Sequence, residues 1–303
     1  MSLSIRPVMQ FVRSCRIIGA LLALILFLPG CSTVKLAYNN AQTMSYWWLD
    51  SYFDFNPAQS EKVRAELAAL QAWHRARQLP AYINTLEKLQ RAAPANVTPQ
   101  QICDVLAELK SHVQTLIDQA EPTLAALAPT LTEEQLAHLA RQLDKRSQKW
   151  REEWLEGSPA ERQARRVKKL AERADMFYGP LEEAQLTLLR TQVATSAFDA
   201  NLSWRESQRR HQDTLQTLRE LQGASLGAPR VRAMVHGLLA RAVSSPDPAH
   251  RNYVDKLNQE NCKTFAALHN SSTPAQRIKL IDTLKDYAAD ARALMADGTN
   301  IPS

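Results

Sequence analysis

Glycine is scarce in this sequence, with eight residues in 303, and no glycine-rich loop of the phosphate-binding kind is present. Alanine, leucine, glutamine, glutamate and arginine dominate instead, and these are strong helix formers. With 45% hydrophobic and 22% charged residues, the composition is that of a globular protein and not of a disordered one. We therefore expect helices throughout the body of the chain.

Dense spacings of metal-binding residues are also missing. The seven histidines are scattered, with no H-E-x-x-H pattern, so the sequence predicts neither a metal site nor a cofactor. Gly223 to Gly227 spells G-x-S-x-G around Ser225, a pattern that in some hydrolases presents a nucleophile after a strand. Because residues 214–222 have a helical pattern, we favour a helix end here, and a periplasmic hydrolase using Ser225 remains the alternative.

No hydrophobic run near the N-terminus is long enough for a comfortable transmembrane helix. The run Ile17–Leu28 has twelve residues, which span about 18 Å as a helix, against about 30 Å of bilayer hydrocarbon. The residues before it include Arg6, Arg13 and Arg16 and no acid. A basic segment followed by a short apolar run is the layout of a secretory signal peptide, so we expect export.

The apolar run ends in Leu28-Pro29-Gly30-Cys31, which resembles the lipobox of bacterial lipoproteins. The resemblance implies cleavage after Gly30 and a diacylglyceryl group on the Cys31 thiol. Several acyl chains at this cysteine would tether the protein to a membrane permanently. Ser32 implies the periplasmic face of the outer membrane rather than the inner membrane. Pro29 departs from the more usual Ala or Ser, and an uncleaved signal anchor is the alternative interpretation.

This interpretation divides the chain into three parts. Residues 1–30 are a cleaved signal peptide, residues 31–56 are the lipid anchor with an aromatic N-terminal helix, and residues 57–303 are a helical periplasmic domain. Removing residues 1–30 takes three arginines from the formal charge of +6 and leaves +3. The mature body is therefore nearly balanced in charge. Since an exported protein does not meet nucleic acid, we expect no nucleic-acid partner.

Four predicted helix starts share one pattern: a capping residue, then Pro or Glu, then one further residue, then Gln. They are Asn56 to Gln59, Thr98 to Gln101, Thr132 to Gln135 and Thr273 to Gln276. In such a capping box the first side chain accepts a hydrogen bond from the N3 amide, and the Gln reaches back to the N-cap amide. Ser158 to Glu161 is a fifth case, with Glu in the last place. Each pattern predicts the start of a helix.

Hydrophobic residues follow these starts at three- and four-residue steps, as on one face of a helix. After Thr98 the stripe comprises Ile102, Val105, Leu106, Leu109, Val113, Leu116 and Ile117. Short connections with Pro or Gly favour antiparallel neighbours. The sequence therefore predicts an all-α fold of elongated or bundled antiparallel helices without a sheet. The expected helices cover residues 34–52, 57–78, 81–92, 98–120, 132–156, 159–177, 180–222, 228–243, 248–270 and 274–296.

Two resemblances to known families rest on these motifs. Leu131 to Gln135 is similar to the Leu-Thr-x-x-Gln motif of Spy-type periplasmic chaperones, which implies a holdase-like activity. The lipobox, Lys35 to Asn39, Trp47-Trp48 with Asp50, and Gln59 to Ala65 together resemble a family of Gram-negative lipoproteins that has no assigned activity. The second resemblance covers most of the chain. It implies the localisation and leaves the activity open.

Six aromatic residues crowd residues 46–55, a short distance beyond Cys31. Trp47 and Trp48 fit an aromatic belt at the membrane interface, where amphipathic rings are favourable. The favoured interpretation is instead that the rings dock the N-terminal helix on the bundle, since a tryptophan pair in a compact protein more often belongs to the core.

A second concentration of one residue type is the basic stretch 141–173. Its candidate anion-binding or partner-binding residues are Arg141, Lys145, Lys149, Arg162, Arg165, Arg166 and Lys169, with Trp150 and Trp154 among them. Such a surface would attract the phosphates of lipid A, anionic lipid head groups or an acidic client. Glutamates also occur in this stretch at helical pairing distance, so a solvated, salt-bridged helix face is the favoured interpretation.

Of the four cysteines, Cys15 leaves with the signal peptide and Cys31 takes the lipid. Cys103 and Cys262 remain in an oxidising compartment, where either a disulfide or two buried free thiols would be stable. Together these observations predict a membrane-anchored periplasmic lipoprotein that acts by noncovalent binding of a protein client or envelope component, as a scaffold or a holdase, and that is not an enzyme.

Overall fold

The computed structural model describes residues 33–222 and 226–297. These residues form helices joined by short connections, without any strand, which confirms the predicted all-α fold. The predicted cleavage and lipidation positions Gly30 and Cys31 lie outside the described residues, and so does Ser225. The chain divides into two compact units at the boundary between Asn40 and Ala41, and the following paragraphs treat each unit by itself.

In the first unit the described residues form α2 (Thr33–Asn39). The α-helices of the second unit are α3 (Ala41–Phe53), α4 (Pro57–Trp73), α5 (Leu79–Ala92), α6 (Pro99–Leu127), α7 (Glu133–Trp154), α8 (Pro159–Tyr178), α9 (Glu183–Thr195), α10 (Ala200–Leu221), α11 (Ala228–Val243), α12 (Pro248–Asn270) and α13 (Pro274–Asp297). A π-helical turn (His74–Gln78) joins α4 to α5, and a 3-10 turn (Ala128–Thr130) follows α6.

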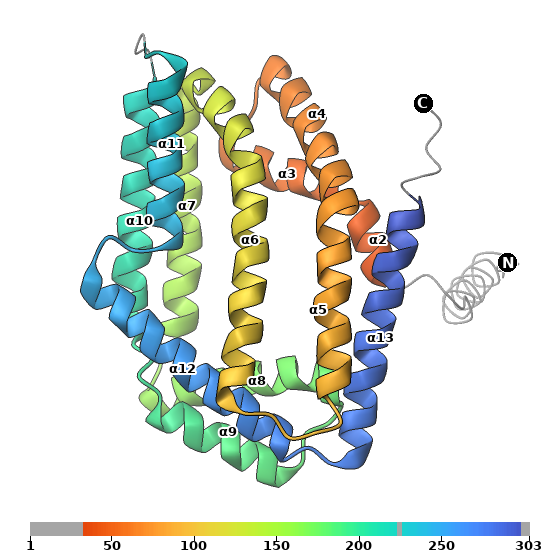
Figure 1. Ribbon diagram of the computed structural model, residues 1–303. Coiled ribbons are helices and arrows are strands. Elements are labelled where there is room, and N and C mark those ends of the chain that lie inside the picture. Colours follow the sequence, from red (N-terminus) through yellow and green to blue (C-terminus); the bar gives the residue numbers. More distant parts are fainter. Residues whose placement is uncertain (1–32, 223–225, 298–303) are drawn as a thin grey trace, which may run out of the picture. The chain divides into compact units, whose positions relative to one another are not determined.

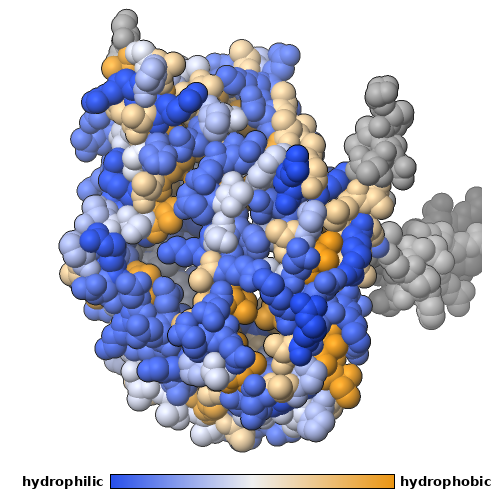
Figure 2. All heavy atoms as spheres, viewed as in Figure 1, coloured by the Kyte–Doolittle hydropathy of each residue, from blue (hydrophilic) through white to orange (hydrophobic). Residues whose placement is uncertain are grey.

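The second unit is a helical bundle (Figure 1). Helix α10 packs against α7 and α11 along one side, and α5 pairs with α13 along the other. Helix α6 lies between these groups, where it contacts α11 and α12, and α8, α9 and α12 pack together at one end. The face that carries α5, α6 and α13 is hydrophilic over most of its area, with separate hydrophobic patches between the helices (Figure 2).

Two of the predicted helix starts are joined to each other through their glutamines. Gln59 at the start of α4 and Gln135 at the start of α7 exchange two amide hydrogen bonds, of 3.2 Å and 2.7 Å. Each Oε1 also accepts from its own N-cap amide, as the capping boxes of Asn56 and Thr132 require. Both side chains are buried. The box that starts each helix therefore also fastens it to the other.

A second pair of helix starts repeats this arrangement. Gln185 on α9 and Gln276 on α13 exchange amide hydrogen bonds of 2.7 Å and 3.0 Å and are buried as well. The capping box at Gln185 was not predicted, because its N-cap is Glu182, a residue type outside the usual capping set.

The capping box at Thr98 and Gln101 differs in having no glutamine partner, although its two internal hydrogen bonds are present. Gln101 is exposed. The same local motif thus occurs in two settings, buried and paired at four helix starts and solvated at this one.

The predicted helix over 180–222 is wrong, because it is two helices, α9 and α10. The break at residues 196–199 is held by side chains of α12: the Glu260 carboxylate accepts from the Ala197 amide at 2.9 Å, and the Tyr253 hydroxyl accepts from the Asp199 amide at 2.9 Å. Asp199 in turn caps α10 by accepting from the Asn201 amide. Partners 54 and 63 residues away in sequence therefore end α9 where helical propensity alone would continue it.

The hydrophobic stripe predicted on α6 is only partly covered. The side chains of Leu109 and Val113 in its middle are 44% and 55% exposed, and no residue of this helix is fully buried. Helix α6 also extends past the predicted end at residue 120, continuing through Pro122 to Leu127. A disulfide between Cys103 on α6 and Cys262 on α12, with Cα atoms 5.4 Å apart, joins these two helices.

Glu206 of α10, which is 7% exposed, is at the centre of a hydrogen-bonded network that reaches Ser245, just after the end of α11. Its carboxylate accepts from Arg209 at 2.8 Å, from Arg210 at 3.1 Å and from the Ser245 hydroxyl at 3.0 Å. Burial by itself would raise the pKa of Glu206, but these hydrogen bonds lower it to about 2. Glu206 is therefore ionised and its carboxylate fully bonded at neutral pH.

If the paired glutamines hold helices together, removing one of them should lower the free energy of unfolding more than removing the glutamine of a solvated capping box. We expect Gln59→Ala to lower the free energy of unfolding by about 2–4 kcal/mol, because the cap and the buried amide partners are both lost. Gln101→Ala, the matched control, should cost about 1 kcal/mol or less. Urea unfolding followed by circular dichroism measures both. Equal losses in the two variants would show that the pairing contributes nothing.

Glu206→Gln should lower the free energy of unfolding at pH 7 by about 3 kcal/mol, since it breaks a buried ion pair. A carboxylate whose pKa is lowered from 4.5 to about 2 stabilises the fold fully above pH 4.5 and loses that contribution as pH falls through 2. The difference between wild type and variant should therefore hold from pH 7 to pH 5 and shrink as the pH falls from 4.5 to about 2. The exposed Glu61→Gln control should change stability by about 0.5 kcal/mol at most. A difference independent of pH would contradict this assignment.

Candidate functional site

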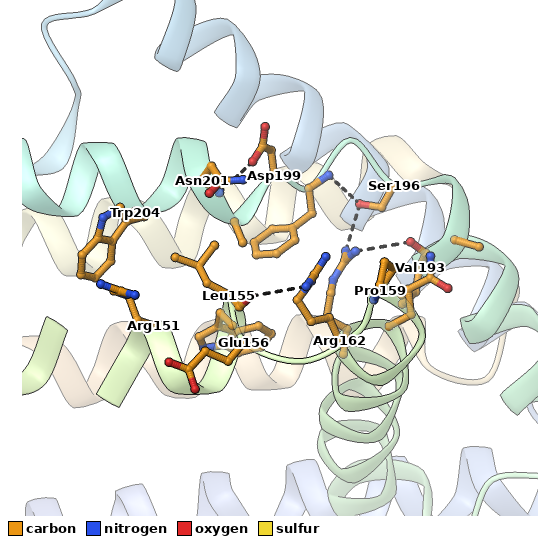
Figure 3. Close-up of a pocket in the computed structure, with 16 residues that line it drawn as sticks. Arg151, Leu155, Glu156, Pro159, Arg162, Val193, Ser196, Asp199, Asn201 and Trp204 are labelled. Atoms are coloured by element: carbon orange, nitrogen blue, oxygen red, sulfur yellow. Dashed lines mark hydrogen bonds between the residues drawn. The ribbon is translucent and has the colours of Figure 1, made fainter. Parts of the chain in front are cut away.

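A cavity lies where the end of α7 and the start of α8 meet the end of α9 and the start of α10. Its volume is about 750 Å³. Its lining combines guanidinium groups with aromatic rings, and Figure 3 shows their arrangement. We call this the cationic cleft, and it is lined by Arg151, Trp154, Leu155, Glu156, Pro159, Arg162, Gln163, Arg166, Val193, Ala194, Ser196, Phe198, Asp199, Ala200, Asn201 and Trp204.

The aromatic rings of the cleft contact one another across helices. Trp204 of α10 stacks on Trp150 of α7 with ring centres 5.9 Å apart, and Trp154 meets the edge of Phe198 at 6.0 Å. Trp154 and Trp204 are only partly buried, so ring surface remains at the cleft. These contacts hold a rigid apolar wall made from three separate segments.

Cations cover faces of these rings. The Arg166 guanidinium lies 4.4 Å from the centre of Phe198, and the Arg151 guanidinium lies 5.9 Å from the centre of Trp204. Figure 3 shows the Arg151 side chain extending alongside Trp204. Cation–π contacts of this kind orient a guanidinium without neutralising its charge.

The hydrogen bonds of the deeper arginines go to neutral oxygens. Arg162 donates to the backbone carbonyls of Leu155 and Gly157, at 3.3 Å and 2.5 Å. Arg166 donates to the Val193 carbonyl at 3.3 Å and to the Ser196 hydroxyl at 3.1 Å. Burial lowers the pKa of Arg166, an effect that the nearby Glu260 carboxylate partly opposes. These interactions fix the guanidinium groups, and none of their hydrogen-bond acceptors is a carboxylate.

Two carboxylates also line the cleft. Asp199 is turned to the start of α10, where it accepts from the amides of Asn201 and Leu202. Glu156 is exposed, and its carboxylate extends away from Arg162 in Figure 3. The first turns of α8 and α10 contribute the positive ends of their helix dipoles at the same cleft. The balance of charge near the rings is therefore positive.

The residues predicted from the basic stretch separate into two groups. Arg162 and Arg166 line the cleft, and two further residues lie next to it: Arg165 donates to the Glu156 carbonyl, while Lys169 lies over Trp154 and pairs with Glu153. Arg141, Lys145 and Lys149 are exposed on α7 and are not part of the lining. A salt-bridged face, the favoured interpretation from sequence, describes the Lys169 pair but not the two arginines inside the cleft.

Sequence reasoning missed the wall of the cleft opposite the basic stretch. Ser196 and Phe198 belong to the break between α9 and α10, and Trp204 lies just after it near the start of α10; the predicted continuous helix concealed this break. A signal for the break was present, since Asp199 followed by a helical pattern is a helix start. No signal linked this segment to the basic stretch, because the link is tertiary.

The aromatic residues after the predicted anchor, on α3 and in the connection to α4, differ in burial. Tyr46 and Phe55 are buried in the core, as the docking interpretation requires. Trp47 and Trp48 are 60% and 54% exposed, so the expectation that the tryptophan pair docks in the core is wrong. The neighbouring Tyr46 and Phe55 provide the docking contacts instead, and the indole rings are left at the surface.

The remaining features considered from the sequence are the G-x-S-x-G motif, membrane-spanning segments and metal-binding residues. The segment 222–227, which contains the G-x-S-x-G serine, joins the helices α10 and α11, and Gly227 is the N-cap of α11. Over residues 33–222 and 226–297, no helix combines the length and apolar character needed to cross a bilayer. The same residues contain no group of three or more histidine, cysteine, aspartate and glutamate side chains placed to bind a metal ion.

Comparison with known proteins places the chain in a family. A family model described as a family of unknown function (DUF6279) matches residues 51–232, more than half of the chain, so the chain belongs to this family. The matched segment includes Gln59 to Ala65 and every lining residue of the cationic cleft, but not the lipobox or Trp47-Trp48. Neither the curated proteins nor the solved structures gave a match.

Proposed function

We propose that this member of a family of unknown function is a lipid-anchored periplasmic lipoprotein that binds an anionic ligand noncovalently in the cationic cleft. The anchor would be the Cys31 thioether, and the body would act from the periplasmic face of the outer membrane as a scaffold or holdase-like binding protein. The observation that carries the binding role is the pair Arg162 and Arg166, whose hydrogen-bond acceptors are neutral oxygens.

The anchoring part of the proposal rests on the sequence. A basic segment, a twelve-residue apolar run and Leu28 to Cys31 stand in the order of a lipoprotein signal. A disulfide between Cys103 and Cys262 is consistent with an oxidising compartment such as the periplasm.

The chemistry of the cleft indicates the kind of ligand. Guanidinium groups suit phosphate or carboxylate oxygens, which they can bind with two parallel hydrogen bonds. The rings of Trp154, Phe198 and Trp204 beside them suit an apolar or flat part of the same molecule. We therefore propose an anionic envelope component with an apolar part, of which a phosphate-bearing lipid head group is the simplest example. The flanking helices give no support to the alternative hydrolase using Ser225, whose motif would follow a strand.

The anchor is tested by Cys31→Ala in the full chain expressed in a Gram-negative host. We expect the variant to lose incorporation of an alkynyl fatty acid and to leave the membrane fraction, because the thiol is the point of acylation. Cys103→Ala is the matched control and should be labelled as the wild type is. Continued labelling of the Cys31 variant would refute the anchor.

The cleft is tested with two water-soluble short-chain phospholipids, dihexanoylphosphatidylglycerol, which is anionic, and dihexanoylphosphatidylcholine, which is zwitterionic. We expect the anionic lipid to change tryptophan emission saturably, with an affinity that falls as salt is raised. Arg151→Gln with Arg162→Gln should weaken this binding by about tenfold or more.

The control for the cleft is Arg173→Gln, which removes an exposed arginine of α8 that does not line the cavity. Its affinity should stay within about twofold of the wild type. Equal binding of the two phospholipids, or equal loss in both arginine variants, would show that the cleft is not the anion site.

A further inference from the structure

A second cavity, of about 500 Å³, lies at the other end of α10, in the core that α3, α4, α6, α10 and α11 enclose. Its lining is almost entirely aliphatic and aromatic, in contrast to the cationic cleft. The lining residues are Leu49, Phe53, Phe55, Val63, Glu66, Leu67, Ala69, Leu70, Gln119, Ala120, Thr123, Leu124, Leu127, Ala128, Leu131, Thr214, Leu218, Val235, Leu238, Leu239 and Ala242. We call it the apolar cavity.

The lining is graded from core to surface. Phe55, Val63 and Leu218 belong to the buried core of the bundle. Ala69 of α4 and Gln119 and Leu124 of α6 are exposed, so the cavity opens to solvent between these two helices. Contact between an apolar molecule and these apolar walls is more favourable than contact between the walls and water.

The opening carries a negative charge. The Glu66 carboxylate lines the cavity and accepts a hydrogen bond from the Thr123 hydroxyl at 2.9 Å, which holds it between α4 and α6. Glu121, one residue from the lining Ala120, pairs with His236 of α11 at 2.8 Å. An occupant with an anionic end would meet the Glu66 carboxylate, whereas a cationic or uncharged end would not be repelled.

From this lining we propose that the apolar cavity is a binding site for a single aliphatic chain whose polar end is cationic or uncharged. The aliphatic chain of the ligand lies among the core side chains of α3, α4, α10 and α11, and the polar end of the ligand lies at the opening beside Glu66. The volume is in the range of cavities that hold small apolar ligands. This site is separate from the cationic cleft and does not depend on the function proposed for it.

The test uses the full chain carrying Cys31→Ser, which brings no attached acyl chain to the cavity. Dodecylamine and dodecanoate, both below their micelle concentrations, are titrated by calorimetry, and stoichiometry is read by native mass spectrometry. We expect one dodecylamine per chain and affinity for dodecanoate lower by about tenfold or more. If dodecylamine does not bind one-to-one, the proposal is overturned.

Two variants locate the site and separate binding from folding. Ala242→Phe fills the cavity and should reduce dodecylamine affinity by about tenfold or more, whereas the exposed Ala240→Phe, two residues along α11 and outside the lining, should not. Glu66→Gln should bring the affinities of the two probes to within about threefold of each other. Equal effects of the two phenylalanines, or a preference for the amine that survives Glu66→Gln, would overturn the assignment.

Discussion

The reciprocal hydrogen bonding of buried glutamines at helix starts is the interaction on which the bundle most depends. A helix start leaves amide groups without partners, and burial makes each such group costly. Here Gln59 and Gln135, and likewise Gln185 and Gln276, each satisfy their own N-cap amide and a partner's side chain at once. Four helix starts can therefore lie in the interior, where they fix α4 to α7 and α9 to α13.

The binding sites lie further along the helices that these contacts fix. Helix α7 begins at the Gln59–Gln135 pair and ends with Arg151 and Trp154 in the cationic cleft. Helix α9 begins at the Gln185–Gln276 pair and ends at the opposite wall of that cleft. Helices fixed at their far ends therefore hold the walls of the cleft in place. A noncovalent binding site needs walls that are positioned in this way before the ligand binds.

The helices and most of their starts could be predicted from sequence, because capping and hydrophobic periodicity act within a few residues. Asp199 was a sequence signal for the start of α10, but the contacts with Glu260 and Tyr253 of α12 that hold the break at Ser196 to Asp199 are tertiary and could not be predicted. The glutamine pairs were likewise hidden: Gln101 and Gln135 stand in the same local pattern, and only the tertiary fold separates the solvated one from the buried one. The basic stretch supplied Arg162, Arg166 and Trp154 of the cationic cleft, and the opposite wall with Phe198 and Trp204 came from the break and the start of α10.

The most direct test of this account is amide hydrogen exchange, measured by NMR on the full chain, at matched positions of the capping boxes. The N-cap and N3 amides of the joined helix starts, Thr132 and Gln135 among them, should exchange about tenfold or more slowly than Thr98 and Gln101 of the solvated start. Equal exchange at joined and solvated starts would contradict the claim that glutamine pairing holds the bundle together.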